Sequence, residues 1–172
     1  MNTFWDDRFL QEGRIWGESP SKTARLACDL FRRDGVRSVL VPGCGYGRNA
    51  VYFHKNGFDV TGIEMSREAL RLAEKDNPGI TYHHGSVLDM PFGDRRYDAV
   101  YCFNVLHLFQ KKDREIFVER CLDQLAEGGV MFFAVFSDQE SSFGKGRRVE
   151  ENTFERKPGR TVHYFSEADL AG

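Results

Sequence analysis

The sequence predicts an α/β protein with a doubly wound, mostly parallel sheet and helices on both of its faces. Two observations support this prediction. Between residues 38 and 136, short apolar runs alternate with segments of helical periodicity, as in successive βαβ units. The apolar run Val39–Val41 ends in Pro42 and a glycine-rich turn, which is typical of a parallel strand buried on both faces.

Five strands and three helices are expected in this stretch. The strands are expected over 39–41, 58–63, 80–84, 97–103 and 130–136, and the helices over 49–56, 66–76 and 111–125. Ser66 is a good N-cap for the second helix. Gly128 and Gly129 are expected to end the third helix and to start the fifth strand. The polar strand over 80–84 is expected at an edge of the sheet.

Composition excludes several classes of protein. The net charge of −2 gives no reason to expect nucleic acid as a partner, and no apolar run approaches the roughly 20 residues of a membrane-spanning helix. The first residues lack the apolar stretch of a signal peptide, so the cytoplasm is the expected location. No disulfide or zinc framework is expected, because the four cysteines are widely spread: Cys28, Cys44, Cys102 and Cys121.

The glycine triplet after the first strand is the most informative motif. Gly43, Gly45 and Gly47 allow a tight turn and let a ligand approach the backbone without a Cβ in the way. Glu64 ends the second strand, 17 residues after Gly47. In this fold such an acid lies beside the first loop and can accept hydrogen bonds from both hydroxyls of a ribose. The pattern predicts a cofactor that contains a nucleoside.

The spacing of the glycines indicates which cofactor is bound. Dinucleotide-binding loops read G-x-G-x-x-G, whereas this loop reads G-x-G-x-G and has Arg48 where the third dinucleotide glycine would stand. A phosphate-binding P-loop would need Gly-Lys-Ser/Thr, which is absent. S-adenosylmethionine (SAM) has no phosphate, so its loop needs backbone room rather than an anion cradle. The spacing therefore favours SAM.

Four segments in order resemble the motifs of class I SAM-dependent methyltransferases, which have a Rossmann-like fold. They are residues 39–45, 59–66, 85–92 and 97–107. The first, Val-Leu-Val-Pro-Gly-Cys-Gly, is similar to the cofactor loop of the thiopurine and thiol methyltransferase branch. The aromatic segments around Trp5 and Trp16 resemble those of small thiol and tellurite-resistance methyltransferases, in which such a segment folds over the cofactor. Alternatively, both tryptophans only hold the arm on the domain.

The resemblance implies roles for individual residues. Glu64 would bind the ribose of SAM, and Asp89 would read the adenine amino group while its neighbours pack on the ring. The implied cofactor contacts are Trp16, Pro42, Gly43, Cys44, Gly45, Gly47, Glu64, Met65, Val87, Leu88, Asp89, Met90, Phe103 and Asn104. His107, just past the fourth strand, is the candidate general base, with ordering of the loop as the alternative role. No metal is expected, since the adjacent His83 and His84 point to opposite faces of a strand.

The chain departs from the family pattern in two places. Pro42 stands where the family usually has an acid, so the amino group of SAM needs another partner, for which the backbone carbonyls of Gly43 and Phe103 are candidates. The family fold also continues after its fifth strand with a helix and an antiparallel pair, which this sequence lacks. We therefore expect the strand over 130–136 to be an unpaired edge. Either the chain is a truncated product, or another copy in a homo-oligomer covers this edge.

The 172 residues are expected to form a single methyltransferase domain. Residues 1–35 would form an N-terminal arm and a helix near 21–31, and residues 36–136 the cofactor-binding core. Residues 137–172 would form a long loop and the start of an incomplete C-terminal part. The loop carries a basic cluster, Lys145, Arg147, Arg148, Arg156, Lys157 and Arg160. This cluster is either a solvated mobile loop or a lid that attracts an anionic acceptor through Arg147 or Arg148.

The predicted function is the transfer of a methyl group from SAM to a small-molecule acceptor, with S-adenosylhomocysteine (SAH) as product. The acceptor would be a thiol, a chalcogen or another metabolite nucleophile. Two alternatives stay open at this point. An NAD(P)-dependent oxidoreductase shares the fold and the ribose acid, and a non-catalytic SAM-binding domain shares the motifs.

Overall fold

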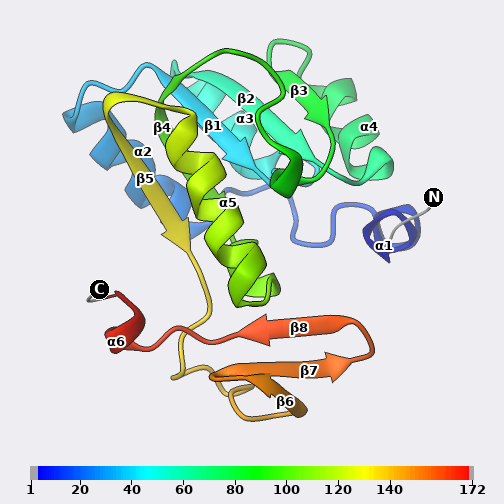
Figure 1. Cartoon of the computed structure of the whole chain (residues 1–172). Coiled ribbons are helices and arrows are strands. Elements are labelled where there is room, and N and C mark those ends of the chain that lie inside the picture. Colours follow the sequence, from blue (N-terminus) through cyan, green and yellow to red (C-terminus); the bar gives the residue numbers. More distant parts are fainter. Residues whose placement is uncertain (1–3, 171–172) are drawn as a thin grey trace.

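Five parallel strands form the centre of the computed structural model, which describes residues 4–170 (Figure 1). They are β1 (Ser38–Pro42), β2 (Asp59–Glu64), β3 (Thr81–His84), β4 (Tyr97–Phe103) and β5 (Leu125–Ala134). Their order across the sheet is β3-β2-β1-β4-β5. The chain runs outward from β1 to β3 and then crosses back to β4, so the order reverses between β1 and β4. In open α/β sheets, ligands bind at such a switch point, outside the carboxyl ends of the strands.

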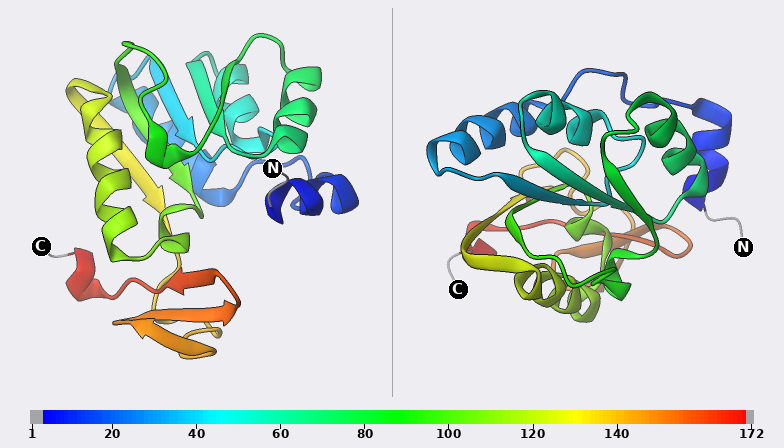
Figure 2. Two further views of the ribbon diagram at one scale, coloured as in Figure 1. Left: turned by 45° about the vertical axis from the view of Figure 1, so that its right-hand side comes forward. Right: turned by 90° about the horizontal axis from the view of Figure 1, so that it is seen from above.

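Helices cover both faces of the sheet, as predicted (Figure 2). The helices α2 (Lys22–Arg33), α3 (Arg48–Lys55) and α4 (Arg67–Asp76) cover one face, and α5 (Lys111–Asp123) covers the other. The hydroxyl of Ser66 caps α4 by accepting a hydrogen bond from the backbone N–H of Ala69 at 3.2 Å. The doubly wound α/β fold is thus confirmed. No helix among residues 4–170 is long and apolar enough to span a bilayer.

An aromatic cluster fills the layer between the sheet and helices α2 and α3. Phe53, which is fully buried, lies with its ring centroid 4.9 Å from that of Tyr101, 5.8 Å from that of Phe31 and 6.0 Å from that of Phe58. On the opposite face, Phe117 of α5 packs into a second apolar cluster with residues of β1 and β4. Burial on both faces explains why β1 is almost continuously apolar.

The N-terminal arm differs from the short aromatic segment expected. It forms the helix α1 (Phe4–Glu12), which lies against α4 at the edge of the domain (Figure 1). Phe9 is the buried anchor of this helix, and the hydroxyl of Ser66 donates a 2.7 Å hydrogen bond to the carboxylate of Asp6. The apolar stripe of α1 is too short for sequence periodicity alone to identify a helix.

The expectation of a long loop after the fifth strand is wrong for residues 147–163. These residues form a three-stranded antiparallel sheet of β6 (Arg147–Glu150), β7 (Thr153–Lys157) and β8 (Arg160–His163), which is followed by α6 (Glu167–Leu170). This C-terminal sheet lies beyond the carboxyl edge of the central sheet (Figure 1). The rings of Phe143, Phe154 and Tyr164 hold it together, with centroids 5.5–6.1 Å apart. Charged residues alternate with these few aromatic side chains, so the polar sequence of this stretch does not predict strands.

The boundary between α5 and β5 also differs from the prediction. The helix ends at Asp123, and β5 begins at Leu125, ahead of Gly128 and Gly129. The pairing of β5 with β4 shifts register between Tyr97 and Ala99, so the two glycines lie in an irregular part of the strand. Among the described residues β5 pairs along its length only with β4, so its outer edge is open, as expected. Coverage of that edge by a second copy stays a prediction.

Truncation of Phe53 tests whether the aromatic cluster holds the sheet and its helices together. We expect Phe53→Ala to lower the free energy of unfolding by about 3–5 kcal/mol, because it removes contacts with three aromatic neighbours and leaves a cavity. Urea titration measures the change. Leu122→Ala is the control, since Leu122 is 53% exposed and should cost less than about 0.5 kcal/mol. Equal losses in both variants would contradict this account of the core.

Candidate active site

A cavity of about 730 Å³ lies at the carboxyl ends of β1, β2 and β4. This is within the size range of small-molecule sites. The glycine loop, Glu64 and residues 103–109 form its walls, together with the aromatic side chains of the N-terminal arm. Residues 159–162, from the C-terminal sheet and its turn, also line it. The cavity therefore occupies the switch point that the strand order defines.

The backbone of β2 holds the glycine loop in place. The N–H groups of Gly43 and Cys44 both donate to the carbonyl oxygen of Ile63, at 2.7 and 3.0 Å. Gly43 has a φ of 68°, and a Cβ at this position would lie 2.3 Å from Cγ2 of Val105. A residue with a side chain would therefore be strained and would push away the segment that follows β4. The glycine here lets two loops meet at the cavity.

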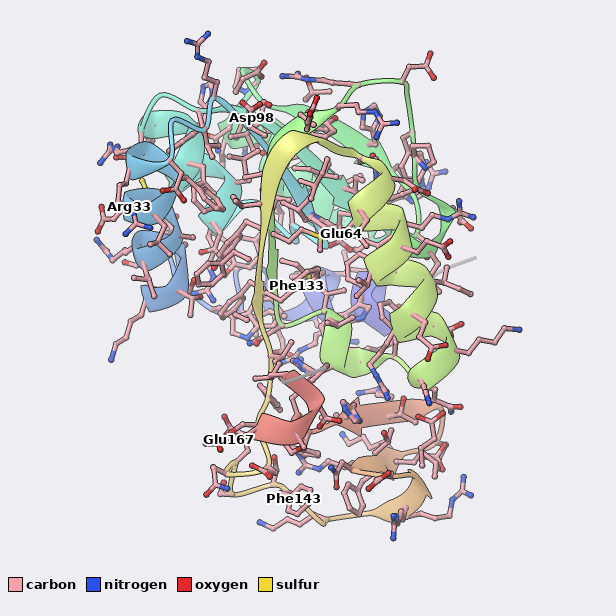
Figure 3. The ribbon with its side chains drawn as sticks, turned by 60° about the vertical axis from the view of Figure 1, so that its left-hand side comes forward. Arg33, Glu64, Asp98, Phe133, Phe143 and Glu167 are labelled. Atoms are coloured by element: carbon pink, nitrogen blue, oxygen red, sulfur yellow. The ribbon has the colours of Figure 1, made fainter. Side chains whose placement is uncertain are left out.

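Glu64 joins this loop to the start of α4. One carboxylate oxygen accepts a hydrogen bond from the N–H of Gly45 and the other from the N–H of Ser66, both at 2.9 Å. Burial raises the pKa of Glu64, and the backbone N–H groups of Ser66 and Gly45 oppose part of that rise. Figure 3 shows Glu64 inside the fold. A carboxylate has about four acceptor positions, so Glu64 keeps acceptor capacity for a ligand in the cavity.

The indole of Trp16 forms part of the cavity wall and is stacked on Tyr46. The two ring centroids are 6.1 Å apart and the planes differ by 15°. The hydroxyl of Tyr46 donates to the carbonyl of Gly17 at 2.7 Å and accepts from the N–H of Trp16 at 2.9 Å. Arg48 donates to the carbonyl of Trp16 at 3.1 Å. The arm is thus fixed to the glycine loop by polar contacts as well as by ring packing.

His107 lies deep in the cavity wall. It is 3% exposed, and its ring is stacked on that of Phe136 with centroids 4.2 Å apart. The buried Nδ1 has no hydrogen-bond partner among the described residues. Burial, helped by the nearby His163, lowers the pKa of His107 to about 4, so the imidazole is neutral at neutral pH. A neutral ring nitrogen can accept a proton or a hydrogen bond from a ligand.

Most of the predicted site residues meet at this cavity. Those that line it are Trp16, Gly43, Cys44, Gly45, Glu64, Met65, Val87, Leu88, Phe103, Asn104 and His107. Asn104 has a positive φ of 57°, which is unusual for a residue with a side chain and is most frequent at functional sites.

Four predicted residues do not line the cavity: Pro42, Gly47, Asp89 and Met90. Pro42 is buried at the end of β1, and Gly47 is the N-cap of α3. Met90 is a core residue, 1% exposed, and Asp89 is exposed at the end of the short 3₁₀-helix η1 (Val87–Asp89). Gly47, whose φ is 85°, serves the turn into α3 rather than the ligand.

Several wall residues could not be identified from the sequence. Tyr46, Arg8 and Thr161 line the cavity, but they come from parts of the chain far from the motifs or from between the loop glycines. Arg48 also lines the cavity. The sequence marks it only as the residue that stands where a dinucleotide-binding loop has its third glycine. Among residues 4–170 no group of three metal-ligating side chains is arranged to hold a metal ion.

The pH dependence of stability tests the buried, neutral state of His107. The unfolded chain takes up a proton near pH 6.5, whereas the folded protein holds the pKa of His107 at about 4. Stability is therefore full above about pH 6.5 and is lost as the pH falls toward 4. His107→Phe keeps a ring against Phe136. Protonation of His107 on unfolding should lower the free energy of unfolding of the unmodified protein by about 2 kcal/mol between pH 7 and pH 5. We expect this decrease to be absent in His107→Phe.

Urea titrations of both proteins at the two pH values measure this difference. The pKa of His163 is also lowered by burial, and this residue is present in both proteins, so its contribution largely cancels in the comparison. An identical pH dependence in the two proteins would mean that His107 is not buried in its neutral form.

Comparison with known proteins identifies the family. The model of the methyltransferase domain family matches residues 39–129, which run from β1 into β5. The chain is 30% identical over 144 residues to a probable S-adenosylmethionine-dependent methyltransferase of Mycolicibacterium smegmatis, covering 83% of this chain and 54% of that protein. It is 30% identical over 119 residues to a dTDP-3-amino-3,6-dideoxy-alpha-D-glucopyranose N,N-dimethyltransferase of Streptomyces fradiae, covering 67% and 46%. The chain thus spans about half the length of these curated relatives.

Solved structures show the same fold. The CcbJ methyltransferase of Streptomyces caelestis matches 98% of this chain and 84% of its own, with a TM-score of 0.76 and 18% identity. A 1,6-didemethyltoxoflavin-N1-methyltransferase of Burkholderia thailandensis, solved with bound SAH, matches 96% and 72%, with a TM-score of 0.70 and 24% identity. With the family match over more than half of its residues, the chain belongs to the methyltransferase domain family, within the class I SAM-dependent methyltransferases.

Proposed function

We propose that the protein transfers the methyl group of SAM to a small-molecule acceptor. The observation that carries this proposal is the pairing of Glu64 with the N–H groups of Gly45 and Ser66 at the wall of the cavity. The carboxylate keeps acceptor capacity on the cavity side, which the hydroxyls of a ribose can use. Family membership supports SAM as the cofactor, and we propose that it binds in this cavity.

We propose a role toward SAM for each of the residues around the cavity. In our proposal Glu64 binds the ribose, and the backbone of Gly43 and Gly45 gives room to the methionine moiety. Val87 and Leu88 pack on the adenine and are supported from the core by Met90, and Asp89 accepts a hydrogen bond from the adenine amino group. The exposed carboxylate of Asp89 lies at the end of η1 and would have to turn toward the cavity to do so. Trp16, stacked on Tyr46, covers the methionine end.

SAM, when bound, supplies a methyl group activated by a positively charged sulfur. The chain contributes alignment and the exclusion of water, which together can account for about 7–11 kcal/mol of barrier reduction in favourable cases. Phe103 and Asn104, at the end of β4, form the floor of the cavity beside Gly43 and Gly45. The aromatic arm and the C-terminal sheet enclose it from outside. We propose that these walls hold the acceptor in line with the methyl group.

The acceptor we propose is a metabolite with a thiol, a chalcogen or another nucleophilic atom. The Pro42-Gly43-Cys44-Gly45 loop and the aromatic arm support the thiol branch. The named relatives widen the choice, because one acts on an amino sugar and one structural neighbour on a didemethyltoxoflavin. All of these acceptors are small molecules, and a cavity enclosed on several sides by side chains suits them.

We propose His107 as the residue that accepts the proton of the acceptor. It lines the cavity, and its ring is neutral with Nδ1 unpartnered among the described residues. With a pKa of about 4 it is a weak base, suited to holding the acceptor by a hydrogen bond and to taking up a proton as the methyl group is transferred. A thiol ionises near neutral pH without help, so it depends less on this group.

Loss of cofactor binding on neutralisation of Glu64 tests the proposal. We expect the protein to bind SAH in calorimetry and Glu64→Gln to weaken that binding by about 10- to 150-fold, because a hydrogen bond to a charged group contributes about 1.5–3 kcal/mol. Glu127→Gln is the matched control, because Glu127 is exposed on β5, away from the cavity, and should leave the affinity unchanged.

Two results would contradict the cofactor assignment. The first is the absence of SAH binding by the unmodified protein. The second is an equal affinity of the Glu64→Gln and Glu127→Gln variants. Circular dichroism of each variant confirms that any loss of binding is not a loss of the fold.

Replacement of His107 tests its role in proton transfer. We expect His107→Phe to lower kcat for an amine acceptor by about a hundredfold, since general-base catalysis contributes roughly 10²–10⁴-fold. For an aromatic thiol the loss should be below about tenfold at pH 8. Methyl transfer from labelled SAM measures both rates. Equal losses for the two acceptors would mean that His107 serves only to position the loop.

A further inference from the structure

The C-terminal sheet supplies one wall of the cavity through its β7–β8 hairpin. Lys157 and Arg160 are paired across a turn formed by Pro158 and Gly159, whose φ is 72°. Residues 159–162 line the cavity opposite the glycine loop. The first strand residue after the turn, Arg160, is therefore held beside the cavity by a hairpin.

Thr161 fixes the hairpin to the wall that contains His107. Its hydroxyl donates a 3.2 Å hydrogen bond to the carbonyl oxygen of Leu108, next to His107. On the other side, the guanidinium of Arg160 lies 3.2 Å from the ring centroid of Phe4 in α1. Arg160 thus connects the C-terminal sheet to α1. Both Arg160 and His107 line the cavity.

Arg160 is the member of the basic cluster that reaches the cavity. The other five residues of the cluster, including Arg147 and Arg148, do not line it. Arg147 instead pairs with Glu155, with an N–O distance of 2.5 Å, and Arg148 donates to the carbonyl of Glu150 at 3.3 Å. The expectation that Arg147 or Arg148 attracts the acceptor is therefore wrong in its choice of residues.

The other charged groups of the cavity already have partners. Arg8 pairs with Glu12 at 3.4 Å, and Arg48 donates to the carbonyl of Trp16. Glu64 accepts two backbone hydrogen bonds. Among residues 4–170, Arg160 has no carboxylate within 4 Å of its guanidinium nitrogens. It is also exposed. The face of its guanidinium contacts the ring of Phe4, which leaves the N–H donors in the guanidinium plane for a ligand, and this planar fork matches a carboxylate.

We propose that Arg160 binds an anionic group of the methyl acceptor, so that the acceptors of this enzyme are small molecules with an apolar body and a carboxylate. The apolar body would lie along Leu108, Phe109 and Phe136, which line the same cavity as Arg160 and His107. The carboxylate would occupy the fork of Arg160, and the nucleophilic atom would point to the depth of the cavity. This inference rests on the proposed function, since it assigns the acceptor to the same site.

Binding of a matched pair of probes tests the proposal without turnover. The probes are 4-mercaptobenzoate and 4-methylbenzenethiol, which differ in whether a carboxylate or a methyl group lies opposite the thiol. Calorimetry would be carried out with and without SAH on the unmodified protein and on Arg160→Met, Arg160→Lys and Arg147→Met. Arg160→Met keeps an apolar side chain of similar length against Phe4 but removes the charge. Arg147→Met removes an exposed charge of the same hairpin sheet outside the cavity.

We expect the unmodified protein and Arg147→Met to bind 4-mercaptobenzoate at least tenfold more tightly than 4-methylbenzenethiol, since the thiol group is common to both probes and only the carboxylate differs. Arg160→Met should lose this preference while its SAH affinity stays within twofold, and Arg160→Lys should keep part of it. If Arg160→Met retains the full preference, or the unmodified protein shows none, the proposal is wrong and Arg160 only joins the hairpin to α1. A failure of SAH binding with the preference intact would overturn the cofactor assignment and not the anion site.

Discussion

The carboxylate of Glu64 is the link on which the geometry of the site depends. It is buried at the end of β2 and uses one oxygen for the N–H of Gly45 and the other for the N–H of Ser66. These two hydrogen bonds fix the distance between the loop after β1 and the start of α4. Burying a charge is costly unless it is hydrogen-bonded, and two charge-assisted bonds offset that cost here. The pairing thereby fixes Gly45 and Glu64, which both line the cavity.

The two ends of the described chain add walls to the cavity at the carboxyl edge of the central sheet. The α1 arm is attached to the glycine loop through Trp16 and Tyr46, and the C-terminal sheet is attached to the β4 side through Thr161 and Leu108. In our account the central motifs bind the cofactor, and these flanks choose the acceptor. Such a division allows the flanks to differ between members of one family while the cofactor site stays the same.

The sequence predicts the central sheet well because burial on both faces leaves a strong apolar pattern in β1 and because Ser66 and the loop glycines mark their turns. It does not predict β6–β8, since Arg147, Glu155 and other charged side chains alternate there with few apolar ones. The cofactor loop and Glu64 follow from motifs, whereas Tyr46 and Thr161 reach the cavity through tertiary contacts. No local pattern marks such residues, because their role depends on segments far away in the chain.

Hydrogen exchange with and without SAH tests the central claim most directly. If the cofactor lies between the glycine loop and Glu64, SAH should slow exchange of the amides of residues 43–47, 64–66 and 86–89. Exchange in residues 93–95, at a separate small cavity on another part of the surface, should be unchanged. Protection confined to the second region, or no protection in the first, would contradict the account.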